Sequence, residues 1–486
     1  MKKTVLVFTL FLALNCFSQN KQVLYNFTSV PQSLLTNPGS DFKYEWYFGV
    51  PLLSGISVNV GSTGFSAYDL FANNGVDFNV KLRNALFFTT RKDHLAINQQ
   101  LEIFNGGFKI ANGDHDTYVS FGMYQEFDVL SYVPKDLAVL ALDGNRDYLG
   151  KIFNLGDLNV KAEMLSVFHV GFHKNINTKF IFGARAKIYS SIFNASSINN
   201  SGYIYTIPSN TGIYEQEIYS QLKLNTSGVA SYNNENGEID LAKDITNRAF
   251  LAGNLGLGFD AGFTYYPKKN IQLTASIIDI GFIKHSKDVE SYSLKGLYNY
   301  RGVVPSFSSG QSVDNIYKEF QEAIPLDTLY SKYTTWRPAK FNSSIQFSLD
   351  EERPEDCDCL NQNSEIIFRS AIGAQLFIMT TSRTPLVAFT TYYRRKVFKS
   401  LDVKATYTLD SYSFKNIGLG LSTNFGPVNF YVLADNLLEY RDFTKANNLS
   451  FQLGLNVIFK NNKKQNLRSM RLFSSFISFV NFDPKH

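Results

Sequence analysis

The stretch Leu255–Pro267, LGLGFDAGFTYYP, decides the fold class of this chain. Its alternate residues are apolar and fall on one face of an extended strand: Leu255, Leu257, Phe259, Ala261, Phe263 and Tyr265. The residues between them are glycines or small polar residues. A soluble sandwich would place polar bulk on its wet face, so this pattern favours a strand with lipid on one side and a crowded barrel interior on the other.

The same alternation recurs along most of the chain, which makes the pattern strong evidence. It is found in Ser166–His173, Phe180–Ile188, Ile271–Ile277, Phe341–Leu349, Val403–Leu409 and Leu449–Phe459. Tyr44–Gly61 reads as the first strand, with Pro51 marking a bend or an edge, and Leu449–Phe459 as the closing strand. With tilted strands of roughly 10 residues, we predict an all-β transmembrane antiparallel β-barrel of about 14 strands.

The composition agrees with this fold class. The chain has 486 residues, of which 44% are hydrophobic and 15% aromatic, the latter suiting aromatic girdles at two membrane interfaces. After the N-terminus, no apolar run approaches the roughly 18 residues that a spanning helix needs. The net charge of +5 is too mild to argue for nucleic acid. A soluble secreted β-sandwich is the alternative fold.

The N-terminus predicts export. Lys2 and Lys3 precede the apolar run Thr4–Leu14, and small residues suit cleavage before Gln19. The alternative is a lipoprotein with Cys16 as the lipidated residue. We therefore divide the chain into a signal peptide (1–18), an N-terminal periplasmic or plug segment (19–43), the barrel (44–460) and a C-terminal tail (461–486).

The connectors alternate in length, as in outer-membrane barrels. Lys174–Thr178 and Pro267–Asn270 read as short periplasmic turns, whereas Asn194–Tyr214, Ala230–Arg248 and Lys284–Pro338 read as long polar extracellular loops.

Two stretches within the connectors have helical spacing. Val313–Ala323 is amphipathic. Phe78–Phe88 could be a short helix in a loop or plug, or one more irregular strand, because the surrounding Gly64–Gln100 region is mixed.

Charged residues and histidines on small strand faces are the candidate lumen lining: His169, His173, Arg185, Lys187, Asp260 and Lys404. His169 and His173 are separated by ~13 Å of strand, so they cannot chelate one ion together. Inward charges form either a structural network of ion pairs or a selectivity lining, and the sequence does not separate these alternatives.

Cys357 and Cys359 lie in an acidic stretch, Asp350–Glu365, which reads as another connector. In an oxidising compartment the pair reads first as a local strained disulfide or as two idle thiols. A divalent-cation site is the alternative, although the spacing fits no zinc framework. We predict no resident metal and no cofactor.

Motifs of catalysis are missing from the sequence: it has no GxSxG, HExxH or Walker loop. Gly256-x-Gly258-x-x-Ala261 matches a dinucleotide fingerprint formally, but it lies inside strand alternation with no helix pattern after it. We predict that the protein is not an enzyme. A serine and a histidine adjacent at the membrane rim would revive a lipid-modifying activity.

Several segments carry a family resemblance: the leader KKTVLVFTLFLALNCFSQ, VLYNFTSVPQSLLTNPGS (Val23–Ser40), SIIDIGFIKH (Ser276–His285) and VLADNLLEY (Val432–Tyr440). From about Gln22 to Phe459 the chain resembles the DUF5723 family of Bacteroidota outer-membrane barrels. It is more distantly similar to PorP/SprF-like barrels of type IX secretion and to FadL-like transporters of hydrophobic compounds. The resemblance implies a fold and a location in the outer membrane of a Gram-negative bacterium, and no catalytic residue.

The expected function is a passive channel or transporter for a small or hydrophobic solute, for which the small inner face leaves room. The alternative is a structural or docking barrel for surface or type IX secretion-associated proteins, for which the long loops argue. The expected partners are outer-membrane lipid, the barrel-insertion machinery and a surface protein, with no nucleic acid.

Overall fold

The computed structural model describes residues 21–112, 115–208, 214–229, 241–300, 313–352, 367–410 and 412–459. Its strands are β1 (Trp46–Gly49), β2 (Ile56–Ser62), β3 (His94–Asn112), β4 (His115–Tyr132), β5 (Ile152–Asn154), β6 (Val160–Asn177), β7 (Phe180–Ser197), β8 (Ser201–Pro208), β9 (Tyr214–Ser227), β10 (Asn254–Lys268), β11 (Ile271–His285), β12 (Val289–Tyr300), β13 (Leu326–Leu329), β14 (Tyr333–Trp336), β15 (Lys340–Glu352), β16 (Ile367–Met379), β17 (Leu386–Lys396), β18 (Leu401–Leu409), β19 (Asn416–Phe425), β20 (Val428–Asp435) and β21 (Asn448–Phe459).

The helices are short and lie in the connectors or near the N-terminus. They are η1 (Pro31–Leu35), α2 (Ala67–Phe71), α3 (Phe78–Phe88), α4 (Lys135–Asp143), η2 (Arg146–Tyr148), α5 (Leu241–Asn247), η4 (Arg248–Ala252), α6 (Val313–Ala323) and η5 (Leu437–Arg441). None of the helices in the described ranges is long and apolar enough to cross a membrane.

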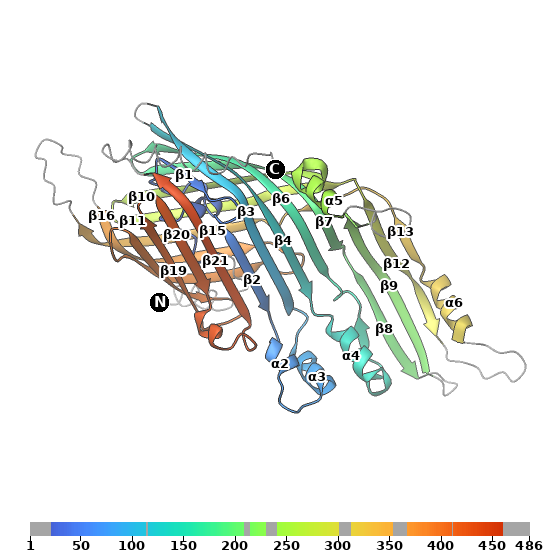
Figure 1. Ribbon diagram of the computed structural model, residues 1–486. Helices are drawn as coiled ribbons and strands as arrows, with labels where there is room; N and C mark the ends of the chain where they lie inside the picture. Colours follow the sequence, from blue (N-terminus) through green and yellow to red (C-terminus); the bar gives the residue numbers. More distant parts are fainter. Residues whose placement is uncertain are drawn as a thin grey trace, which may run out of the picture.

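The strands close into one antiparallel barrel (Figure 1). Going round the wall, β1 and β2 share the first position and are followed by β3, β4, β6, β7, β10, β11, β15, β16, β17, β18, β19, β20 and β21. β21 pairs with both β1 and β2 and so closes the ring at 14 positions. The predicted fold class, strand number and closing strand are confirmed.

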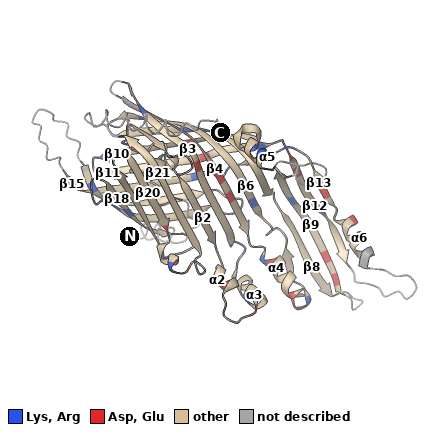
Figure 2. Cartoon of the chain, viewed as in Figure 1, with Lys and Arg blue, Asp and Glu red and all other residues tan. Residues whose placement is uncertain are grey.

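The polarity of the wall is inverted relative to a soluble protein. Figure 2 marks the positions of the charged residues along the chain, several of which lie within the wall strands. Along β10, Leu255, Leu257 and Phe259 are exposed, whereas Asp260 and Thr264 are buried. The other wall strands follow the same rule, with exposed Ile, Leu, Val and Phe outside and buried Ser, Thr, Asn, Gln and charged residues inside. This is the arrangement of a barrel whose outer face meets lipid.

The first wall position is interrupted: the strand expected over Tyr44–Gly61 is divided into β1 and β2. Pro51 and Leu52 lie between β1 and β2, where regular pairing with the neighbouring strands is interrupted, and the φ of Leu52 is 64°. The gap is sealed by main-chain bonds: the Leu52 N–H donates to the Ile103 carbonyl at 3.2 Å, and the Leu455 N–H donates to the Leu53 carbonyl at 2.8 Å. Pro51 marks a bend, as predicted.

One end of the barrel has tight turns, such as Thr178–Lys179 and Lys269–Asn270, and the other has long connectors. Two of the three long connectors that we expected to be polar loops, Asn194–Tyr214 and Lys284–Pro338, instead contain strands. β9 and β12 pair over twelve residues beyond the barrel wall, with β8 and β13 on their outer edges, and we call these four strands the outer sheet.

The two helices suggested by the sequence are present with the predicted bounds, as α3 and α6. Both belong to connectors at the long-connector end (Figure 1), so Phe78–Phe88 is a helix outside the lumen. The lumen is instead occupied by residues 22–40, nearly all of which are buried. We call residues 22–40 the plug.

Candidate functional site: a filled lumen and an apolar groove

The plug is held mainly through its main-chain carbonyls, because the inner wall offers many polar donors. Lys404 donates to the carbonyls of Gln22 and Tyr25, and Arg185 donates to those of Leu34 and Leu35. These buried cations meet carbonyl oxygens that would otherwise lack partners, and hydrogen bonds from charged donors are about twice as strong as neutral ones. The wall therefore holds the plug through hydrogen bonds to its main chain.

One plug side chain contacts the interrupted wall strand directly. Gln32 donates to the Ser54 carbonyl at 2.9 Å and to Glu102 at 3.1 Å. The Tyr431 hydroxyl donates to the same Ser54 carbonyl at 3.0 Å. The bend between β1 and β2 is thus bonded from inside the lumen by the plug.

The turn Asn37–Gly39 approaches the wall so closely that only glycine fits. A Cβ atom built on Gly183 would overlap the Pro38 carbonyl, and one on Gly39 would overlap the Gly262 carbonyl. The Thr264 hydroxyl donates to the Gly39 carbonyl at 2.7 Å. The small inner face of β10 therefore accommodates the plug.

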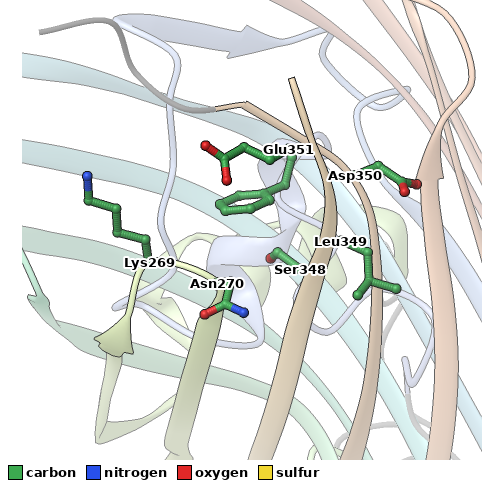
Figure 3. Close-up of a pocket in the computed structure, with 7 residues that line it drawn as sticks. Lys269, Asn270, Ser348, Leu349, Asp350 and Glu351 are labelled. Carbon is green, nitrogen blue, oxygen red and sulfur yellow. The ribbon is translucent and has the colours of Figure 1, made fainter. Parts of the chain in front are cut away.

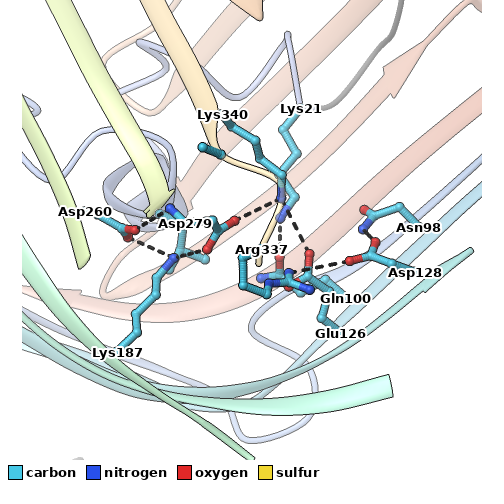
Figure 4. Close-up of polar contacts among 12 residues, drawn as sticks. Lys21, Asn98, Gln100, Glu126, Asp128, Lys187, Asp260, Asp279, Arg337 and Lys340 are labelled. Carbon is cyan, nitrogen blue, oxygen red and sulfur yellow. Dashed lines mark hydrogen bonds and ion pairs between the residues drawn. The ribbon is translucent and has the colours of Figure 1, made fainter. Parts of the chain in front are cut away.

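Charged residues form a network inside the lumen (Figure 4). Its members are Lys21, Glu126, Asp128, Glu163, Arg185, Lys187, Asp260, Asp279, Arg337 and Lys340. Lys187 lies 2.9 Å from Asp260 and 2.6 Å from Asp279, and Lys340 lies 3.0 Å from Asp279. A cavity of about 30 Å³ remains among them, which is room for a water molecule.

Arg337 carries this network across the lumen. It precedes β15, the eighth position of the wall, yet it pairs with Glu126 of β4 at 2.9 Å and with Glu163 of β6, the third and fourth positions. Lys340 makes a parallel contact with Glu126 at 3.6 Å. These ion pairs join strands on different sides of the lumen without involving the plug.

The mouth at the long-connector end is closed by aromatic residues. The Tyr132 hydroxyl, at the end of β4, lies 3.2 Å from the Thr381 hydroxyl in the β16–β17 connector on the far side of the ring. The His94 ring nitrogen Nε2 lies 3.2 Å from the Tyr412 hydroxyl in the β18–β19 connector. The rings of His94 and Tyr132 are 5.8 Å apart. We call these four residues, with Arg383, the mouth cluster.

A groove of about 410 Å³ lies beside the mouth, between the outer sheet and the end of β4. Its apolar lining consists of Tyr132, Pro134, Leu158, Val160, Leu222, Leu224, Leu294 and Leu326. Leu222 pairs with Leu294 on one face of the outer sheet, which faces the groove. The volume is within the range of sites that take small organic molecules.

A second hollow, of about 300 Å³, lies at the tight-turn end (Figure 3). Lys269 and Glu351 are on its opposite walls, with Ser348 and Asn270 between them. Its lining is polar and open, so it resembles a hydrated rim more than a binding site.

The residues predicted to line the lumen are all buried in the wall: His169, His173, Arg185, Lys187, Asp260 and Lys404. Three of them, Arg185, Lys187 and Asp260, belong to one ion-pair network, and Lys404 contacts the plug. His173 stacks on Tyr118 and His169 lies against Tyr124, apart from that network. Whether any of them selects a solute stays a prediction.

Cys357 and Cys359 lie outside the described residues, so the structure does not bear on their role. Within the described ranges, no group of three or more His, Cys, Asp or Glu side chains could hold a metal ion.

The sequence reasoning missed Arg337, Tyr132 and Arg383, because each lies at a strand end or in a connector where no alternation marks it. The signal that could have found Arg337 is a lone arginine in WRPAK, directly before a strand with polar inward residues.

This architecture defines a plugged transmembrane β-barrel. The chain belongs to the family of unknown function DUF5723, whose pattern matches residues 38–435. A search of curated proteins found no match.

Solved barrels resemble this chain over most of its length. The toluene transporter TbuX of Ralstonia pickettii has a TM-score of 0.38 and 9% identity, with 88% of this chain and 94% of that chain covered. The toluene transporter TodX of P. putida has a TM-score of 0.35 and 10% identity, with 92% of this chain and 96% of that chain covered. A Pseudomonas aeruginosa FadL homologue has a TM-score of 0.39 and 10% identity, with 92% of this chain and 99% of that chain covered.

Proposed function

We propose that this protein is an outer-membrane barrel that passes a small apolar or amphiphilic solute, which first binds in the groove beside the mouth. The long connectors then face the outside of the cell and the tight turns face the periplasm. The observation that carries this proposal is the groove itself, because leucine, valine and tyrosine side chains line a hollow of about 410 Å³, a size that suits a small organic molecule.

The filled lumen supports a gated passage over an open pore. The plug and the Arg337 network both occupy the lumen, so passage requires them to rearrange. Because the contacts between plug and wall are mostly polar, water can replace them when the plug moves, which keeps the cost of rearrangement moderate.

The groove can be tested with 4-fluorotoluene as the probe, by fluorine NMR on the protein in lipid nanodiscs. Leu294→Asp places a carboxylate in the groove, and we expect it to weaken binding at least tenfold. Leu297→Asp is the matched control, since Leu297 lies three residues along the same strand on the opposite, exposed face.

Transport is tested in the same variants by uptake of labelled toluene into cells that express them. Uptake that falls with Leu294→Asp and is kept with Leu297→Asp supports the proposal. Equal, weak binding of 4-fluorotoluene to both variants and to the unaltered protein would reject the proposed solute site and favour the docking role.

A further inference from the structure

The groove and the lumen share one residue. Tyr132 lines the groove, and its hydroxyl contacts Thr381 on the other side of the mouth. Its ring also lies next to His94, whose other contact is Tyr412. A solute in the groove is therefore separated from the lumen by the Tyr132 ring and the residues that hold it.

Arg383 holds that ring in place. Its guanidinium carbon lies 4.6 Å from the centre of the Tyr132 ring, in cation–π contact. The same guanidinium donates to the carbonyls of Arg91 and Gly156, both at 2.8 Å, and to Asp157 at 3.3 Å. Three connectors, those after β2, β4 and β16, thus meet on one side chain.

A second arginine reinforces the same junction. Arg91 lies 3.1 Å from Asp136 and 3.3 Å from Asp157, so both connectors held by Arg383 are also joined to each other. Arg91 is largely exposed, whereas the Arg383 side chain is mostly buried. Because screening by solvent weakens exposed ion pairs, the buried Arg383 dominates the junction.

We propose that Arg383 is the positioning residue that controls passage from the groove into the lumen, by fixing Tyr132 over the mouth. This inference rests on the proposed function, since it assigns the inner boundary of the same groove. Passage then requires the connectors to separate at Arg383, a change of a few contacts that leaves the barrel wall intact.

The test measures access to the lumen directly, without relying on transport. Cys16, Cys357 and Cys359 are replaced by serine and Thr408→Cys is added as a reporter. Thr408 is buried on the inner side of β18, directly below the connector that carries Tyr412. The labelling rate of this thiol by a membrane-impermeant methanethiosulfonate bearing a trimethylammonium group reports opening of the mouth.

We expect Arg383→Gln to raise the labelling rate about tenfold or more, which is the change that loss of a charge-assisted hydrogen bond produces. Tyr132→Ala should raise it as much, whereas Tyr132→Phe keeps the ring and should raise it less. Lys415→Gln is the matched control, because Lys415 is an exposed cation at the same end.

Unchanged labelling in both Arg383→Gln and Tyr132→Ala would overturn the inference. Binding of 4-fluorotoluene to these variants separates the two proposals. Faster labelling without any probe binding would support the role of Arg383 and reject the groove as a binding site. Probe binding with unchanged labelling would support the groove and reject the role of Arg383. Heat-modified migration of each variant on gels shows that the barrel has folded.

Discussion

Arg337 and Glu126 form an ion pair of 2.9 Å although they are 211 residues apart and belong to wall positions on opposite sides of the lumen. Both side chains are almost fully buried. The pair therefore acts as a cross-brace between two parts of the barrel wall that are not neighbours, and it fills space that an open pore would leave to water.

Removing this brace should destabilise the protein. Arg337→Ala leaves Glu126 and Glu163 buried without their shared cation, and breaking a buried pair from one side costs about 3–5 kcal/mol. Urea unfolding in lipid vesicles measures the loss. Lys332→Ala removes an exposed cation from the same connector and should leave the midpoint unchanged, so an equal loss in both variants would contradict the cross-brace.

The fold could be predicted from the sequence because its evidence is local. In β10 the alternation of Leu255, Leu257 and Phe259 with small residues is visible within the sequence of a single strand, without knowledge of its neighbours, and each further strand repeats it. The number of strands follows from chain length and strand length. The outer sheet was missed because its strands lie beyond the barrel wall and do not carry the lipid-facing pattern.

The candidate site could be predicted only in part, since it depends on contacts between distant residues. Arg185, Lys187 and Asp260 were found because they lie on small strand faces, but Arg337 and Tyr132 receive their roles only when the ring closes. For residues 19–43 the sequence left a periplasmic segment and a plug as alternatives, because polar, turn-rich residues suit both. Residues 22–40 are buried because the inner wall is polar as well.

The outward face of β10 should not tolerate charge. Leu257 is 59% exposed on the lipid side of the wall, so Leu257→Arg should destabilise the inserted barrel by ~2–4 kcal/mol. Leu297→Arg is the control, because Leu297 is 50% exposed but lies on the outer sheet beyond the membrane. Unfolding in lipid vesicles measures both, and equal tolerance would argue for a soluble sandwich.

Stability should depend on pH through Asp410, in the connector after β18. Burial raises the pKa of its carboxyl from 3.8 to about 6, although the carboxylate accepts hydrogen bonds from the N–H groups of Tyr412 and Ser413. The folded state then binds the proton more tightly than the unfolded chain.

The contribution of Asp410 is fully present below pH 3.8 and is lost as the pH rises through about 6. The free energy of unfolding should therefore fall across this window, by an amount on the order of 3 kcal/mol. Asp410→Asn keeps an acceptor for both N–H groups and should remove this component of the pH dependence. An unchanged slope between pH 4 and 6 would show that Asp410 is not the cause.

The close approach of plug and wall gives the last prediction. Gly183→Ala brings a methyl group onto the Pro38 carbonyl, a main-chain atom that cannot turn aside, so the plug must shift. Such overpacking costs about 1–3 kcal/mol. Gly106→Ala is the matched control, because the nearest atom is the edge of the Phe121 ring at 3.2 Å, which can move.

Urea unfolding of both variants should be repeated after deletion of residues 22–36. Because the deletion removes the main-chain path that holds Pro38 against the wall, the penalty of Gly183→Ala should disappear. A penalty that persists without the plug would instead place the strain within β7 itself.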